Sequence, residues 1–278
     1  LWVDHSLQVE QDFLATLSSQ YDVGVHRQAL LEDPKQGAQD INDWVSGATD
    51  GRITDLMGNR LDPDVAFVLV NALAFEGTWA GGSLEETASP VTFTCLDGHE
   101  VGVPFLRAQT GVYASTPAGQ MTELAYDGGA LRLKLFLPAE GTWDQARESI
   151  LSGQLPIGDD ELNSADVRLS FPAAELLPPT FDLTGNLQTM GLKAVFAPRG
   201  LLGIADDPSL VLSKVRQKAL LRMDAKGTVA TAATAASGTL MIGGPTQPVY
   251  LQLDRPFFLA IEDATGALLF IGQVVDPE

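Results

Sequence analysis

Histidine and cysteine, the side chains that most often act as bases, nucleophiles or metal ligands, are scarce in this chain. Its 278 residues contain three histidines, His5, His26 and His99, and one cysteine, Cys95. The sequence has no His-Glu-x-x-His zinc motif, no Gly-x-Ser-x-Gly nucleophile elbow and no glycine-rich phosphate loop, and these chemistries depend on such spacings. We therefore expect no enzyme activity, no cofactor and no metal site, with the histidines at the surface and Cys95 as a small strand side chain.

A tract of small, uncharged side chains at residues 227–238 is the most informative local feature. It reads Gly-Thr-Val-Ala-Thr-Ala-Ala-Thr-Ala-Ala-Ser-Gly. Its threonines, valine and bracketing glycines disfavour a helix, and a domain linker is disfavoured because only 40 residues follow it. We favour a segment that is exposed in one state and becomes a central strand in another. Small residues at alternate positions suit that change, because one face of the strand must enter a packed interior. A flexible loop with no special role is the alternative.

Several other segments carry motifs that occur together in one protein family. They are Ile41-Asn42-Asp43-Trp44-Val45 with Thr49-Asp50-Gly51-Arg52-Ile53, the apolar run from Val68 to Trp79, Leu135-Phe136-Leu137-Pro138, Leu212-Ser213-Lys214 and Asp254-Arg255-Pro256-Phe257. In this order, with Gly227-Thr228 opening the small-residue tract, they resemble the serpins. The last motif is highly specific, and together the segments cover essentially the whole chain. The resemblance implies an α+β serpin fold with mostly antiparallel sheets, helices packed around them and an exposed reactive-centre loop.

The resemblance also implies how such a chain acts. A serine protease recognises the exposed loop as a substrate, cuts it and forms an acyl-enzyme. The freed hinge then enters the main sheet as a new strand, and this movement distorts the protease that is still attached. The hinge residues of this sequence are Gly227, Thr228, Ala230, Ala232, Ala233 and Thr234. The region where the main sheet parts is expected to include Asn71, Gln217 and Trp79. Gln217 stands where the family commonly has a histidine, and its amide can donate and accept hydrogen bonds as a neutral imidazole does.

The family's usual spacing, counted from Gly227, places the reactive bond between Met241 and Ile242. The segment from Gly227 to Pro256 is a few residues longer than in common members, so Leu240 or Ile242 is an alternative source of the recognised side chain. No lysine or arginine lies between Gly227 and Asp254, so a trypsin-like pocket built around a carboxylate finds no partner there. We expect the partner to be a serine protease with an apolar pocket, of elastase, chymotrypsin or subtilisin type.

The charge balance limits the other partners. The chain has 36 acidic and 17 basic residues, a formal net charge of −19, and no basic run. Such a surface repels phosphate backbones and anionic lipids, so we expect no nucleic-acid and no membrane partner. A single cysteine cannot form an internal disulfide, so cysteine content leaves the compartment open; only the resemblance favours an extracellular location. We expect a monomer.

Periodicity predicts the elements that carry these segments. Helices are expected over residues 7–21, 34–48, 142–151 and 181–190, a strand covered on both faces over residues 65–75, and antiparallel meanders over residues 91–138. The pattern predicts one serpin domain over residues 1–278. Relative to the family, the N-terminal helices of the usual fold are expected to be absent from this sequence.

A non-inhibitory serpin that acts as a carrier, a chaperone or a plain protease substrate is the alternative function. Such members typically carry bulky or charged hinge residues. The hinge of this chain has neither, so inhibition is favoured.

Overall fold

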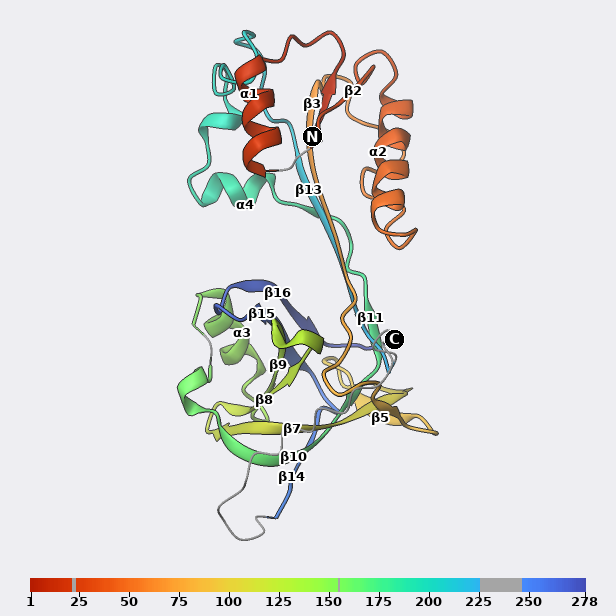
Figure 1. Ribbon diagram of the computed structural model, residues 1–278, viewed down its shortest axis with the longest axis vertical. Coiled ribbons are helices and arrows are strands. Elements are labelled where there is room, and N and C mark those ends of the chain that lie inside the picture. The colour runs from red at the N-terminus through yellow and green to blue at the C-terminus, as the bar shows by residue number, and fades with distance from the viewer. Residues whose placement is uncertain (22–23, 155, 226–246) are drawn as a thin grey trace. The chain divides into compact units, whose positions relative to one another are not determined.

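The computed structural model describes residues 1–21, 24–154, 156–225 and 247–278 (Figure 1). The predicted hinge and the predicted reactive bond at Leu240, Met241 and Ile242 therefore lie outside the described residues. The chain forms two units: the first comprises Leu1–Phe75 and Leu177–Leu221, and the second comprises Glu76–Leu176 and Arg222–Glu278. Helices packed against mixed sheets make the architecture α+β, as the sequence predicts, while the expectation of a single domain over residues 1–278 stays a prediction.

Two long parallel strands form the centre of the first unit. β3 (Phe67–Phe75) pairs with β13 (Val215–Met223) without a break from Leu69 opposite Val215 to Phe75 opposite Leu221, and the two run side by side in Figure 1. On its other side β3 pairs antiparallel with β1 (Trp2–Asp4), which pairs in parallel with β2 (His26–Gln28). β12 (Phe181–Asp182) pairs antiparallel with β13.

Helix α2 (Pro34–Ala48) covers one face of this sheet and matches the prediction at both ends. The Asp33 carboxylate accepts a hydrogen bond from the Gln36 amide at 3.0 Å, and Pro34 occupies the first turn, where no amide hydrogen is needed. Its apolar stripe, with Ile41 and Val45 fully buried, packs on residues of β1, β3 and β13. The helix thus fixes which face of β3 is buried.

The remaining helices of the first unit are short. α1 (Gln11–Thr16) continues as one π-helical stretch over Leu17–Tyr21, so the helix predicted over residues 7–21 begins only at Gln11. α4 (Thr184–Thr189) begins later than predicted, because Phe181 and Asp182 pair with β13 instead. Phe13, Leu14 and Leu187 from these helices pack on a cluster that includes Val3, Phe67 and Val215.

The prediction that the strand over residues 65–75 is covered on both faces is wrong for the described residues. Leu69 and Leu73 are 40% and 37% exposed, and Asn71 between them is also exposed, whereas Val70 and Ala72 pack on the α2 side. Successive side chains of a strand point to opposite faces, so α2 covers only one set. In the other set Phe67 is buried, but among the described residues nothing buries Leu69, Asn71 and Leu73.

The second unit is built on an eight-stranded sheet, with strand order β14-β10-β7-β8-β9-β15-β16 and β4 paired to β7. Its pairs are antiparallel except that β14 runs parallel to β10, and β5 and β6 form a separate hairpin, so the predicted meanders over residues 91–138 are confirmed. The bounds are β4 (Glu85–Glu86), β5 (Val91–Thr94), β6 (Glu100–Val103), β7 (Phe105–Thr116), β8 (Gly119–Ala125), β9 (Leu131–Pro138), β10 (Asn163–Pro172), β11 (Ala174–Leu176), β14 (Val249–Gln252), β15 (Phe257–Asp263) and β16 (Leu268–Val274). β11 pairs with β13, and the last two residues of β13, Arg222 and Met223, belong to the second unit.

Helix α3 (Trp143–Leu151) packs on this sheet, as predicted from the run over residues 142–151. Trp143 stacks on Phe258 of β15, with ring centroids 4.3 Å apart, and Ala146 joins Met121 and Phe136 in the same apolar cluster. Within the described part of the chain, no helix has the length and apolar character needed to span a membrane.

A buried ion cluster crosses three strands of the second unit. The ammonium of Lys134 on β9, only 6% exposed, lies 2.6 Å from Glu262 on β15 and 3.8 Å from Glu123 on β8, and also pairs with Asp159. Burial alone would lower the pKa of Lys134, but the bonds to Asp159 and Glu262 outweigh it and raise the pKa. The lysine thus neutralises two carboxylates that are each only 11% exposed.

We expect Lys134→Met to destabilise the protein, because it leaves Glu262 in a desolvated site without its cation, while Glu123 keeps Arg132 at 3.6 Å. Removing one partner of a buried ion pair typically costs about 3–5 kcal/mol. Urea denaturation measures the change in the free energy of unfolding. Lys35→Met, at an exposed position on α2, is the matched control and should change it by less than about 0.5 kcal/mol. Equal losses in the two variants would contradict the role given to Lys134.

Candidate functional site

The two amide residues predicted for the sheet-opening region are direct neighbours. Asn71 on β3 lies opposite Gln217 on β13 in the parallel register. The residue pairs two positions away on either side are Leu69 with Val215 and Leu73 with Ala219. A polar pair therefore interrupts an otherwise apolar strip where the two central strands meet.

The two amides differ in exposure, and neither titrates. The structure leaves Asn71 exposed, although the sequence predicts a strand buried on both faces, whereas Gln217 is half-buried and also lies opposite Phe181 of β12. A side-chain amide both donates and accepts hydrogen bonds. Unlike a histidine at position 217, neither amide changes its charge near neutral pH, so the capacity of both side chains to form hydrogen bonds does not depend on pH there.

Trp79, the third residue predicted for this region, lies in the second unit, and the structure fixes it tightly. Its ring is 2% exposed, stacks on Tyr126 with centroids 4.8 Å apart, and meets Phe171 edge-on at 6.2 Å. Burial raises the pKa of Tyr126, so this phenol stays neutral. The indole Nε1 of Trp79 donates a hydrogen bond to the carbonyl oxygen of Asp224 at 2.8 Å. Trp79 thereby holds the chain directly after β13.

The residues just before the undescribed segment are held by further contacts. The Leu84 amide donates to the Ala225 carbonyl at 3.1 Å. Arg222 at the end of β13 lies 3.1 Å from Asp224 and 3.4 Å from Glu76. The sequence does not single out Asp224 and Leu84, because their contacts to Trp79 and Ala225 use backbone groups that every residue type carries. It does not single out Arg222 either, because its pairing with Glu76 joins segments far apart in the chain.

The chain is anchored again after the undescribed segment. β14 pairs with β10, and the Leu253 amide donates to the Ser170 carbonyl at 2.8 Å. In the specific motif that follows, the Arg255 guanidinium donates to the Pro138 carbonyl at 2.6 Å, and Phe257 is fully buried. Both ends of the segment that contains the small-residue tract are therefore fixed within the second unit.

The three histidines and Cys95 lie apart from these anchors in sequence. His5 is exposed, 3.5 Å from Glu32. His26 differs from the prediction of a surface residue: it is half-buried on β2 and stacks on Trp2 at 4.5 Å, and its burial lowers the pKa of the imidazole. His99 is exposed in the turn after β5, and Cys95 is a buried free thiol directly after the same strand.

A hollow of about 670 Å³ opens in the second unit over β7, β10, β14 and the segment 80–87. Two arginines line it, but both have partners: Arg107 lies 3.4 Å from Glu85, and Arg168 donates to Gln109 at 2.9 Å. An anionic ligand would compete with these contacts.

Comparison with known proteins gives one consistent family. A family model described as Serpin (serine protease inhibitor) matches residues 1–277. Alpha-1-antiproteinase 2 of Equus caballus is 31% identical over 287 residues, which cover all of this chain and 65% of that protein. This chain thus spans about two thirds of the length of the curated relatives it matches.

Solved structures give the same fold. AtSerpin1 of Arabidopsis, in its native stressed conformation, superposes with a TM-score of 0.80 at 26% identity over 99% of this chain and 74% of that one. Human thyroxine-binding globulin with bound thyroxine gives 0.82 at 24% identity over 99% and 73%. The predicted serpin fold is therefore confirmed. The proteins similar to this chain include an alpha-1-antiproteinase and a thyroxine-binding globulin.

We expect Trp79→Phe to cost about 1 kcal/mol of stability, because phenylalanine keeps an aromatic ring over Tyr126 but cannot donate to the Asp224 carbonyl. Equilibrium unfolding in urea measures the loss. Trp143→Phe, at a tryptophan that also stacks on an aromatic ring in the second unit, is the control for the change in ring size. The anchor assigned to Trp79 is wrong if Trp79→Phe is no more destabilising than this control.

Proposed function

The chain belongs to the serpin family, and from that membership we propose that it is a suicide inhibitor of serine proteases. Serpins are mostly protease inhibitors rather than enzymes. The observation that carries the proposal is the direct parallel pairing of β3 with β13, together with a long run of small residues that begins four positions after β13 ends. After cleavage, the run would enter between these two strands and drag the acyl-enzyme with it.

Strand direction supports this insertion. A segment that leaves the end of β13, turns through residues 224–226 and runs back would be antiparallel to β13, and also to β3, because β3 and β13 are parallel. A turn of this length is ordinary for a β-hairpin. One parallel ladder would be lost and two antiparallel ladders would form, and antiparallel pairing is slightly the more stable per residue. Each added ladder hydrogen bond contributes a net ~0.5–1.5 kcal/mol.

The anchors around Asp224 support the turn. The Trp79 indole and the Leu84 amide hold the carbonyls of Asp224 and Ala225, so the hinge begins from a fixed point. Separation of β3 from β13 would part Asn71 from Gln217. Since both are neutral amides, water can satisfy them while the strands are apart.

Alternation assigns the inserting side chains. If Thr228 faces inward, so do Ala230, Ala232 and Thr234, while Val229, Thr231 and Ala233 face the other way. All are uncharged and no larger than valine. Entry into the sheet therefore buries no charge and little side-chain volume. This favours insertion, because burying an unpaired charged group costs a large free energy.

The proposed target is a serine protease with an apolar specificity pocket, of elastase, chymotrypsin or subtilisin type. The proposed reactive bond is Met241–Ile242, with Leu240 as the alternative recognised residue. The proposal includes a monomer that needs no cofactor and acts outside the cell, the location resting on family resemblance. A non-inhibitory serpin is the competing function, and thyroxine-binding globulin shows that this fold also accommodates a bound small molecule.

The full chain incubated with elastase or chymotrypsin should form a covalent complex that survives SDS, whereas trypsin should form none. The physical reason is that the candidate residues around Met241 are apolar and offer a trypsin-like carboxylate no partner. Mass spectrometry of the released C-terminal peptide should show that it begins at Ile242. A protease whose catalytic serine is replaced by alanine is the control and should give no complex.

The outcomes separate the two functions. Cleavage near Met241 without a stable complex would favour the non-inhibitory alternative. Trapping of trypsin as efficiently as elastase would overturn the apolar specificity, and a peptide beginning at Met241 would move the recognised side chain to Leu240.

Ala230→Arg should convert the protein from inhibitor to substrate, because insertion would then bury a guanidinium without a partner. Val229→Arg is the matched control: it adds the same charge one residue earlier, on the opposite face of the inserting strand, and should keep most of the inhibition. The ratio of covalent complex to cleaved chain at fixed protease concentration measures the effect. Equal ratios for the two variants would refute the proposed alternation.

A further inference from the structure

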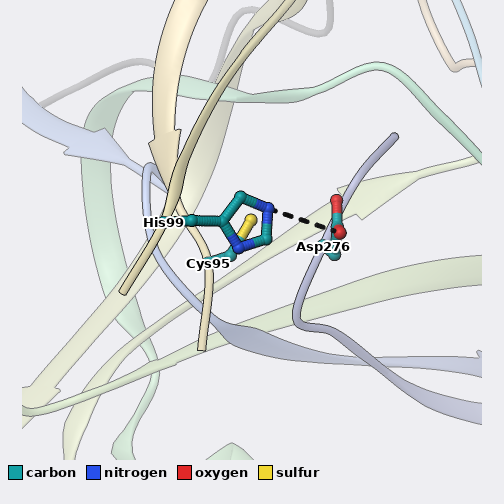
Figure 2. A group of neighbouring side chains, drawn as sticks. All are labelled: Cys95, His99 and Asp276. Carbon is teal, nitrogen blue, oxygen red and sulfur yellow. Dashed lines mark ion pairs between the residues drawn. The ribbon is translucent and has the colours of Figure 1, made fainter. Parts of the chain in front are cut away.

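A cysteine, a histidine and an aspartate converge in the second unit, at a place that the proposed protease trap does not use. Cys95, His99 and Asp276 each offer one metal-binding atom, and these atoms all lie within 4.8 Å of one another. Figure 2 shows the three side chains meeting from two segments of the chain, with the ion pair between His99 and Asp276 drawn as a dashed line. A mixed sulfur, nitrogen and oxygen set of this kind is characteristic of zinc sites.

The hairpin between β5 and β6 positions the first two residues. The Cys95 amide donates to the His99 carbonyl at 2.8 Å, and the Gly98 amide donates to the Cys95 carbonyl at 2.9 Å. Gly98 has φ +90°, a conformation that side-chain-bearing residues rarely adopt. This tight turn brings the thiol and the imidazole to the same end of the hairpin.

The C-terminal segment is fixed against that turn. The Leu96 amide donates to the Val275 carbonyl at 3.1 Å, which places Asp276 beside the hairpin. The Asp276 Oδ2 lies 3.8 Å from the His99 Nε2. Backbone bonds thus hold two ligand-bearing segments together independently of the ligand side chains.

The imidazole of His99 is oriented by a second carboxylate. Its Nδ1 is hydrogen-bonded to Asp97, whose carboxylate also accepts the His99 backbone amide at 3.1 Å. A metal-binding histidine almost always uses its other ring nitrogen in this way, which fixes the ring and its tautomer. Nε2 is thereby directed toward Asp276.

The thiol of Cys95 is placed among the other two candidate ligands. It is buried and free, and its sulfur lies within 4.8 Å of the His99 and Asp276 ligand atoms. A thiol coordinated to a divalent cation is deprotonated, and the charge of the cation offsets the neighbouring carboxylates.

We propose that Cys95 Sγ, His99 Nε2 and the Asp276 carboxylate bind one Zn²⁺ ion, with water as the fourth ligand. Thiolate and imidazole favour zinc over magnesium or calcium, which prefer oxygen ligands. In a tetrahedral zinc site with bonds of about 2.0–2.3 Å, ligand atoms lie roughly 3.3–3.8 Å apart. The 3.8 Å between His99 Nε2 and Asp276 Oδ2 lies at the upper end of this range. His99 and Asp276 are 49% and 45% exposed, so the ion has a direct path from solvent.

Bound zinc would clip the C-terminal segment to the β5–β6 hairpin. Since the folded state alone presents the three ligands together, zinc should stabilise it by mass action. This site is independent of loop insertion, and either proposal can fail without the other.

Calorimetric titration of the chelator-stripped full chain with Zn²⁺ tests the site, and we expect one ion to bind per chain. His99→Gln and Asp276→Asn should each weaken zinc binding at least about tenfold. Asp97→Asn should weaken it about 10–100-fold, because Asp97 orients the His99 imidazole. His5→Gln, at another exposed histidine paired with a carboxylate, is the matched control and should bind as the parent does.

Cobalt substitution reports the thiolate directly. Co²⁺ bound to the parent chain should show near-ultraviolet charge-transfer absorption, which Cys95→Ser should lose. Zinc should raise the melting temperature of the parent chain but not that of His99→Gln. Because Cys95 is buried, its replacement could disturb folding, whereas the variants at the exposed His99 and Asp276 avoid that ambiguity. Absence of saturable binding, or unchanged affinity in both exposed-ligand variants, would overturn the proposal.

Discussion

The pairing of β3 with β13 is the interaction on which the rest of this structure depends. Two strands far apart in sequence pair directly in parallel, so a single strand placed between them could run antiparallel to both. The small-residue tract begins at Gly227, four positions after β13 ends. The proposed inhibitory function needs this pairing to be strong enough to persist before cleavage and weak enough to exchange afterwards. The Asn71–Gln217 pair lies within it as a polar interruption.

The chain is held by specific contacts on both sides of the segment that contains the small-residue tract. Trp79 and Leu84 hold the carbonyls of Asp224 and Ala225, while β14 and Arg255 hold the chain on the other side. These contacts also assign a physical role to the specific Asp-Arg-Pro-Phe motif: Arg255 caps the end of β9 through the Pro138 carbonyl, and Phe257 fills the core.

The carboxylates of this acidic chain are neutralised in different ways in the core and near the surface. Most carboxylates remain at the surface, but Glu123 and Glu262 are buried against Lys134, and Asp276 and Asp97 gather around Cys95 and His99. In the first case the chain supplies its own cation. In the second, the proposed zinc ion would supply it. The first arrangement follows from the rule that a desolvated carboxylate requires a nearby positive charge or hydrogen-bond donors, whereas Asp97 and Asp276 remain accessible to solvent.

The sequence by itself determined the family, the α+β class and the elements with strong local signals. Helix α2 was predictable at both ends because Asp33 caps it, Pro34 opens it and its apolar residues recur at helical spacing. Only the tertiary structure decided which face of β3 is buried, that Asn71 meets Gln217, that Trp79 reaches Asp224 across 145 residues, and that Asp276 joins Cys95 and His99. Local periodicity records how a segment meets its immediate neighbours. Contacts between distant segments depend on strand order and backbone hydrogen bonds, which every residue type supplies alike.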